Sequence, residues 1–474
     1  MVRGIANQSG VACHLSCALQ ILFHCAVPLR EALIELSQTS RTRRKSVLTR
    51  LGDFFALLSE DDTSPIDPTS LYQYLEKETT LDPNNLGDAV KALRILIQTI
   101  RQQCAIEQQQ RQVDVEESSS CDTLKQLVDV SLTGRVRYDL CGRNGSKTRT
   151  KSSRERDMVH PLPVPGTKGS VLKGLGAVTT PMRVQGYRWD ADQEEQDDDG
   201  DNGQWETTKA LRLLRFPQHL FLHLERFEHC NGKLSLLQQD NPLGIPMELQ
   251  DWNDTHHQDN KHSSPPRRRC LCGAMVHVED KDEGEEESEG GHYVVLVRCD
   301  NKKDNWVLLD DDRVQPLVHD DERVIDFLSG RQSLPELPNT TCAATLVVYN
   351  ISSSNGDGDN VVENSTKHED DRLDSLVLRL REQLLEESNV QMQKNEALIG
   401  RRLRVRWARG KYYAGVVSAF DDETGYHTVR YDDGDVRDYL LQQKTIEWID
   451  DDDDATPSSP PPFPSSAEGS QLVK

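Results

Sequence analysis

The chain has 474 residues, too many for one ordinary domain, so we expect two or three folded units. Hydrophobic residues make up 35% of the chain and charged residues 28%, a balance typical of a folded core with polar insertions. The formal net charge of −23 argues against direct binding of nucleic acid or of an anionic membrane surface.

The first predicted element is a helix that starts near Cys13, because Leu15, Leu19 and Leu22 fall on one helical face. A second helix is expected over residues 86–100, which show the same periodicity. Strands are expected where β-branched and aromatic residues cluster, at residues 220–227, 293–298, 306–309 and 344–349. This mixture of helices and strands predicts an α+β domain.

The last part of the chain has a different pattern. Leu373, Leu376, Leu380 and Leu384 recur at helical spacing, and short strands with Gly and Asp turns follow from residue 402 to 448. Three further stretches are acidic or rich in Ser, Asn and Asp, and we expect solvated loops at residues 193–201, 279–289 and 352–371. We therefore expect an α+β domain at 1–350, a linker at 351–370, a connecting helix at 371–398, an all-β barrel at 399–449 and a disordered acidic, Pro- and Ser-rich tail at 450–474.

Three separate segments each supply one part of a thiol peptidase. Cys13 lies at a predicted helix start, where the helix dipole favours the negatively charged thiolate. His292 follows two glycines and opens a strand, and Asp310 ends the next strand. An imidazole can deprotonate the thiol, and a carboxylate can hold that imidazole in one tautomer. Each segment alone has an ordinary structural explanation, whereas their joint presence in this order indicates catalysis.

These segments resemble those of a known family. Residues 4–24 are similar to the Cys box of ubiquitin-specific proteases, and residues 290–311 are similar to their His box. Weaker similarities follow in the family's order, at residues 86–89, 216–227, 245–249 and 346–349. The resemblance covers residues 4–350.

The resemblance implies a papain-like fold of fingers, palm and thumb that grips ubiquitin or ubiquitinated proteins. It implies that Cys13 attacks the carbonyl carbon at the end of ubiquitin's Gly-Gly tail, that His292 acts as base and then acid, and that Asp310 orients His292. Asp311, the neighbouring carboxylate, is expected to assist, and His277 is expected to be structural.

The Cys box departs from the family pattern. The family's Asn, whose amide stabilises the oxyanion, stands five residues before the Cys, where this chain has Gln8 and places Asn7 one residue earlier. Either amide could donate this hydrogen bond. Cys17, one helical turn after Cys13, is expected to point inward. The alternative to an active hydrolase is a degenerate, ubiquitin-binding pseudoenzyme that the C-terminal barrel recruits.

No cofactor is expected. The fingers of the family often hold zinc between two Cys-x-x-Cys pairs, but this chain has Cys141 alone there, and Cys270 and Cys272 have the wrong spacing. The acidic stretch 279–289 runs into the His box, and we hypothesise that it gates the site or selects basic substrates.

The C-terminal barrel resembles a Tudor domain. Such domains often enclose a methylated lysine or arginine in an aromatic cage through cation–π attraction. Trp407, Tyr413 and Tyr431 match cage positions, with Asp433 available to the cation and Tyr439 as the nearest further ring. The resemblance implies methylated protein tails as partners, while the alternative is that the rings only fill a small barrel.

The composition also bears on the compartment. Eleven cysteines without the regular framework of a small secreted domain predict a reducing compartment, and we expect an intracellular protein, cytoplasmic, nuclear or both. The apolar stretch 11–29 is interrupted by polar residues and is too polar to span a bilayer. The basic runs at 41–45 and 267–269 could be import signals or solvated loops.

Overall fold

The computed structural model describes residues 2–39, 46–111, 120–144, 147–157, 159–163, 169–185, 205–230, 233–236, 243–250, 268–280, 291–299, 305–337, 340–351, 363–407, 410–422, 424–441 and 444–449. The described residues fall into two compact units. The first reaches to Leu385, and the second begins at Glu386.

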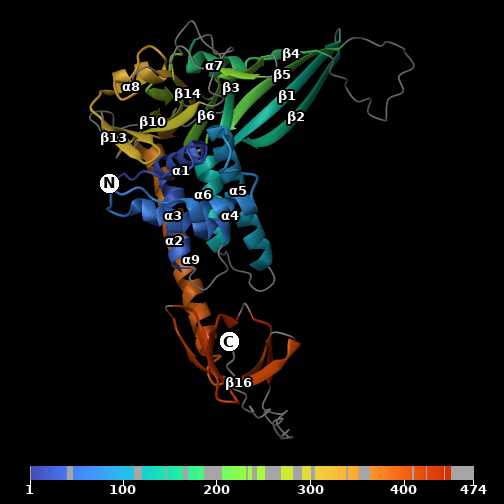
Figure 1. Ribbon diagram of the computed structural model, residues 1–474. Coiled ribbons are helices and arrows are strands. Elements are labelled where there is room, and N and C mark those ends of the chain that lie inside the picture. The colour runs from blue at the N-terminus through green and yellow to red at the C-terminus, as the bar shows by residue number, and fades with distance from the viewer. Residues whose placement is uncertain are drawn as a thin grey trace, which may run out of the picture. The chain divides into compact units, whose positions relative to one another are not determined.

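The first unit contains a group of six helices (Figure 1): α1 (Cys13–Cys25), α2 (Val27–Thr39), α3 (Val47–Ser59), α4 (Thr69–Glu78), α5 (Ala89–Arg111) and α6 (Ser120–Leu132). Helix α1 is buried along nearly its whole length and packs against α5. No single helix among the described residues is long and apolar enough to cross a membrane. Helices α1 and α2, bent by 100° where they meet, pass that test only as a pair, by length and composition.

A mixed sheet in the order β13-β12-β11-β10-β14-β6-β3, with β9 beside β10, positions the site. Its strands are β3 (Val159–Pro163), β6 (His219–Glu225), β9 (Glu248–Gln250), β10 (Arg268–Asp280), β11 (His292–Arg298), β12 (Trp306–Asp310), β13 (Arg313–Leu317) and β14 (Thr340–Ile351). The neighbouring strands are antiparallel, except for the parallel pair β3 and β6.

Both faces of the central part of this sheet are buried, which explains why the middle of β11 and most of β12 are apolar without alternation. Alternate residues of a strand point to opposite faces. Val295 and Val297 of β11 pack in the core that holds α1 and α5, whereas Val294 and Leu296 pack in a second core. That second core includes residues of α7 (Val171–Thr179) and α8 (Asp321–Leu328).

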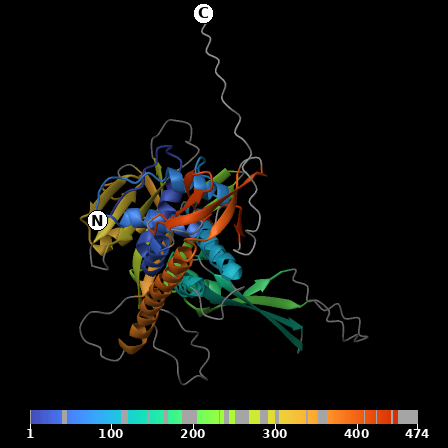
Figure 2. The ribbon, with the colours of Figure 1, turned by 90° about the horizontal axis from the view of Figure 1, so that it is seen from below.

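A four-stranded antiparallel sheet in the order β2-β1-β5-β4 reaches away from the group of helices α1–α6 (Figures 1 and 2). Its strands are β1 (Gly134–Asn144), β2 (Lys147–Asp157), β4 (Met182–Val184) and β5 (Glu206–Arg215). A separate hairpin pairs β7 (Phe227–Cys230) with β8 (Lys233–Leu236).

The second unit contains a five-stranded antiparallel sheet in the order β18-β17-β16-β15-β19. Its strands are β15 (Arg402–Arg406), β16 (Tyr412–Phe420), β17 (His427–Tyr431), β18 (Val436–Tyr439) and β19 (Ile446–Ile449). Leu403, Val405, Val417 and Val429 fill its core, which explains the alternating pattern of these short strands. The predicted α+β domain followed by a small all-β unit is therefore confirmed.

The helix boundaries differ from the sequence prediction. Helix α5 begins at Ala89 rather than near residue 86, because the Asp88 carboxylate accepts a hydrogen bond from the Lys91 backbone N–H at 2.8 Å and caps the helix. Helix α9 (Glu363–Glu396) begins eight residues before the expected start at 371. The added residues are polar but include acids, which a helix N-terminus favours.

Within the basic run at 267–269, Arg269 belongs neither to an exposed signal nor to a solvated loop. That residue lies in β10 and is 1% exposed, and its guanidinium donates to the Pro217 carbonyl at 2.7 Å and the Gln218 carbonyl at 2.9 Å. The sequence prediction was wrong here because a run of like charges does not reveal which side chain finds buried acceptors. The run 41–45, the tail 450–474 and most of the acidic stretches lie outside the described residues.

Candidate active site

The predicted nucleophile, Cys13, is the first residue of α1 and is 2% exposed. The N-terminal N–H groups of a helix have no intrahelical partners, so a negative charge is favoured there. Helix α1 packs against β10 and β11, which fixes the position of its first turn relative to the sheet.

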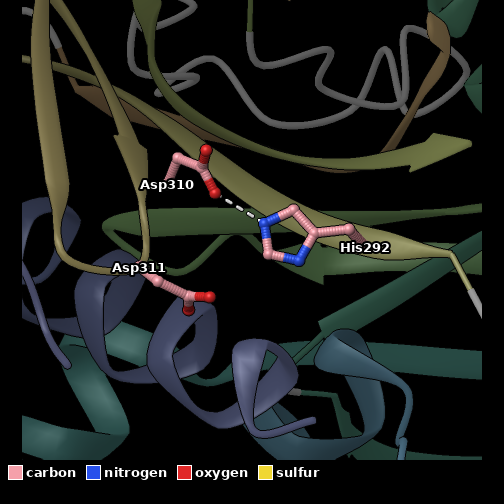
Figure 3. Close-up of side chains that lie close together, drawn as sticks. All are labelled: His292, Asp310 and Asp311. Atoms are coloured by element: carbon pink, nitrogen blue, oxygen red, sulfur yellow. Dashed lines mark hydrogen bonds and ion pairs between the residues drawn. The ribbon is translucent and has the colours of Figure 1, made fainter. Parts of the chain in front are cut away.

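His292 and Asp310 lie side by side in the sheet (Figure 3). The Nε2 atom of His292 lies 2.6 Å from Oδ1 of Asp310, and the other ring nitrogen is turned away from Asp310. Because a carboxylate only accepts hydrogen bonds, Nε2 carries the proton. Nδ1 is therefore the atom that remains for Cys13.

The charges of this pair stabilise each other. The hydrogen bond with Asp310, followed by that with Cys13, raises the pKa of His292 to about 10. The hydrogen bond from His292 in turn lowers the pKa of Asp310. The same interactions place Cys13, His292 and Asp310 in one group, so the structure brings the three predicted residues together. Such a group can hold a thiolate and an imidazolium at once.

Asn7 and Asp311 join this group, while Gln8 does not. Nδ2 of Asn7 donates to Oδ2 of Asp311 at 2.8 Å, and Oδ1 of Asn7 accepts from the Ala12 backbone N–H at 3.2 Å. Burial raises the pKa of Asp311, and Gln8 is exposed in a turn. The extra loop residue thus leaves Asn7 directed to the start of α1.

The positions of Cys17 and His277 fit what was expected of them, an inward-pointing thiol and a structural histidine. Cys17 is buried, and burial raises the pKa of its thiol well above the usual range, which keeps the sulfur protonated and unreactive. The His277 ring packs edge-on against Tyr293 with centroids 4.9 Å apart, and burial lowers the pKa of His277 to about 4. A neutral, packed imidazole of this kind has a structural role.

Sequence reasoning missed two residues that support the site. Gly4 packs so closely that an added Cβ would lie 2.5 Å from the Asp312 carbonyl oxygen, and the Ile5 backbone N–H donates to the Asp311 carbonyl at 2.9 Å. Tyr72 lies 3.0 Å, oxygen to oxygen, from Ser16, whose side chain also forms a hydrogen bond with Asp311. Gly4 opens the Cys box and could have been suspected, but no signal in the sequence marks Tyr72.

His292, Asp310 and Asp311 offer ligand atoms that all lie within 4.8 Å of one another, and these are residue types that bind zinc. The hydrogen bond between His292 and Asp310 explains this closeness without an ion. Of the cysteines considered for zinc, Cys141 lies in β1, whereas Cys270 and Cys272 lie in β10 of the other sheet.

The barrel brings three of the four predicted cage residues together. The ring centroid of Trp407 lies 5.0 Å from that of Tyr413 and 5.6 Å from that of Tyr431, and Trp407 Nε1 donates to the Tyr431 hydroxyl at 2.9 Å. Asp433 is instead exposed in a turn, where its Oδ1 accepts from the Asp435 backbone N–H at 3.0 Å.

A cation already lies at these rings. The guanidinium carbon of Arg437 is 4.7 Å from the centroid of Trp407, and Arg437 Nε donates to Asp435 at 2.8 Å. Tyr431 is 3% exposed and donates to the Tyr439 hydroxyl at 3.0 Å, so it forms part of the barrel core.

Comparison with known proteins identifies the family of the chain. The sequence profile of the family "Ubiquitin carboxyl-terminal hydrolase" matches residues 3–341, and that of "PTM/DIR17-like, Tudor domain" matches residues 400–443. The chain belongs to the ubiquitin carboxyl-terminal hydrolase family, and its C-terminal barrel is Tudor-like.

Individual relatives are distant. The chain is 23% identical over 356 residues to ubiquitin carboxyl-terminal hydrolase 13 of Saccharomyces cerevisiae, covering 70% of this chain but only 41% of the yeast protein. It is 24% identical over 351 residues to ubiquitin carboxyl-terminal hydrolase 12 of Salmo salar, covering 70% of this chain and 85% of the salmon protein.

The fold resembles that of the SAGA Ubp8/Sgf11/Sus1/Sgf73 DUB module bound to ubiquitin aldehyde, with a TM-score of 0.53 and 18% identity over 74% of this chain and 70% of that one. The Ubp8-Sgf11-Sgf73-Sus1 module gives a TM-score of 0.50 at 18% identity, covering 74% of this chain and 68% of that one. At this identity the likeness concerns the fold alone.

Proposed function

We propose that this chain is a cysteine-type deubiquitinase, which hydrolyses the isopeptide or peptide bond at the C-terminal glycine of ubiquitin. The observation that carries the proposal is the 2.6 Å hydrogen bond between His292 Nε2 and Asp310, which leaves Nδ1 for Cys13. Family membership supports the substrate class. A similar solved structure was bound to ubiquitin aldehyde, which supports the same class.

In the proposed reaction the Cys13 thiolate attacks the carbonyl carbon of the terminal glycine and forms a C–S bond. The carbonyl oxygen becomes an oxyanion, and the second N–H of the Asn7 amide is available to it, since the first is held by Asp311. His292 then donates its Nδ1 proton to the leaving amine as the C–N bond breaks.

The thioester left on Cys13 is hydrolysed in a second step. His292, now neutral, takes a proton from water, whose oxygen attacks the thioester carbonyl, and the C–S bond breaks to release the ubiquitin carboxylate. Throughout, Asp310 keeps the imidazole in one orientation and stabilises its charged form.

The test uses ubiquitin that carries a C-terminal electrophile, with the wild-type chain, Cys13→Ala and Cys17→Ala. We expect an adduct with the wild type and with Cys17→Ala, and none with Cys13→Ala. Since Cys17 is buried one helical turn away, it is a matched control for thiol reactivity. If the folded wild type forms no adduct but binds ubiquitin, the pseudoenzyme alternative is correct.

We also propose that the barrel binds a methylated cation on a protein tail. The placement of the Arg437 guanidinium over Trp407 supports this, because the indole face accepts a cation there. A ligand has to displace Arg437, which Asp435 holds through a hydrogen bond.

Calorimetry tests this proposal. A methylated peptide should bind more tightly than an unmodified one. Binding should be lost in Trp407→Ala, and the affinity should be a few-fold higher in Arg437→Ala. Equal binding of both peptides would mean that the rings only fill the barrel.

A further inference from the structure

Positive charge is concentrated in the four-stranded sheet of β1, β2, β4 and β5. The sequences of these strands contain twelve Lys and Arg residues against four Asp and Glu residues, in a chain whose formal net charge is −23. The sheet also reaches away from the helical part of the first unit (Figure 2). A local field of this kind attracts anions even when the whole protein is acidic.

One face of the sheet has three exposed cations in adjacent positions. Leu140 of β1 pairs with Lys151 of β2 on one side and with Lys209 of β5 on the other, so their side chains share a face. Gly142, two residues along β1 on the same face, pairs with Arg149. Arg149, Lys151 and Lys209 are all exposed.

Aromatic rings flank these cations. The Lys209 ammonium is 4.3 Å from the centroid of Tyr138, and the Arg149 guanidinium carbon is 5.0 Å from the centroid of Trp205. Both rings are partly exposed. The same face therefore combines a group of cations with a π-face at each end, the combination found where proteins bind single-stranded nucleic acid.

We propose that this sheet binds the phosphate backbone of single-stranded nucleic acid. Nine of the twelve basic residues are arginines, whose planar guanidinium groups match phosphate oxygens. Positions on one face of a strand recur about every 6.7 Å, which forms an extended track rather than a single anion pocket. An acidic protein segment would match the charge but would make no use of Tyr138 and Trp205.

The experiment is fluorescence anisotropy with a labelled oligonucleotide of about twenty nucleotides, which exceeds the span of one binding module. The full chain is compared with the triple variant Arg149→Gln, Lys151→Gln and Lys209→Gln. We expect the variant to bind at least about tenfold more weakly, and the slope of log K against log salt concentration to become about 2 less steep, since each phosphate contact contributes about 0.7.

The matched control removes the same charge from exposed positions on helices of the same unit, with Lys77→Gln, Lys91→Gln and Arg323→Gln. It should bind as the wild type does, and circular dichroism should show both variants folded. The proposal is overturned if the wild type does not bind at about 50 mM salt. It is equally overturned if the two triple variants bind alike, or if a polyglutamate peptide of equal charge competes as well as the oligonucleotide does.

Discussion

At the scale of single residues, Asp310 determines the charge of His292. Their hydrogen bond is the largest contribution to the raised pKa of His292, ahead of the contact with Cys13, while burial of the ring opposes it. The imidazolium is therefore retained where a free histidine would have lost its proton. This retention keeps the imidazolium available as a proton donor over a wide pH range.

The first prediction concerns pH. Because the pKa of His292 rises from 6.5 to about 10, its stabilising contribution is present in full below about pH 6.5 and is lost as the pH rises through about 10. We expect the alkaline limb of kcat/KM for a fluorogenic ubiquitin substrate to lie near the latter value. In Asp310→Asn this limb should move towards neutral pH, and kcat/KM should fall about 10²–10⁴-fold. An unchanged alkaline limb in Asp310→Asn would contradict the role of the carboxylate.

The second prediction distinguishes the two amides before Cys13. Asn7 is held by Asp311 and by the Ala12 backbone N–H, whereas Gln8 is exposed. Loss of one oxyanion donor lowers kcat by about 10²–10³. We therefore expect Asn7→Ala to lose about this much of kcat while KM changes little, and Gln8→Ala to retain nearly full kcat. The reverse result would assign the oxyanion to Gln8.

At the scale of elements, the site depends on where three segments begin and end. Helix α1 begins at Cys13, β11 begins at His292, and β12 ends at Asp310. The segment before α1 contacts the turn after β12, because the Ile5 backbone N–H donates a hydrogen bond to the Asp311 carbonyl oxygen. Asp311 has a positive φ of 52°, so this turn is in an uncommon conformation that such contacts hold.

The third prediction concerns the start of α5. The Asp88 carboxylate caps this helix through the Lys91 backbone N–H, and removal of such a cap costs about 1 kcal/mol. Asp88→Ala should lower the free energy of unfolding by about that amount in urea titrations, whereas Asp88→Asn, which keeps the capping oxygen, should lose much less. If both variants lose the same amount, the negative charge of Asp88 matters rather than its cap.

The sequence predicted these elements unevenly, for physical reasons. Cys13, His292 and Asp310 could be predicted as one group because thiol chemistry requires fixed residue types, and here they stand at the ends of periodic segments. The choice between Asn7 and Gln8 could not be made, because it depends on a hydrogen bond to Asp311, some 300 residues away. The early start of α9 could not be predicted either, because its first residues carry no apolar pattern.

At the scale of the whole molecule, average properties conceal local ones. The net charge of −23 argues against binding of polyanions, yet one sheet has twelve Lys and Arg residues against four Asp and Glu residues. A ligand responds to the field where it binds and not to the sum over the chain. The family match also understates the length of the first unit. The match to the hydrolase family ends at residue 341, whereas the compact unit continues to Leu385.

The last prediction follows from that boundary. Four leucines of α9 are at most 5% exposed and belong to the core of the first unit: Leu373, Leu376, Leu380 and Leu384. Their burial contributes about 6–12 kcal/mol as an upper estimate, which is comparable to the whole stability of a typical domain. A chain that ends at residue 350 should therefore aggregate or unfold, whereas one that ends at 398 should fold and label with the ubiquitin probe.

A pair of substitutions in the full chain separates this core contribution from a mere effect of chain length. Leu380 is 1% exposed, and Leu378, two residues earlier on the same helix, is 57% exposed. Leu380→Ala should lower the free energy of unfolding of the first unit by about 2–5 kcal/mol, because it leaves a cavity, and Leu378→Ala should change it by about 0.5 kcal/mol or less. Equal, small losses in both variants would show that α9 merely connects the two units. A large loss in Leu380→Ala alone would make the helix part of the first unit's fold.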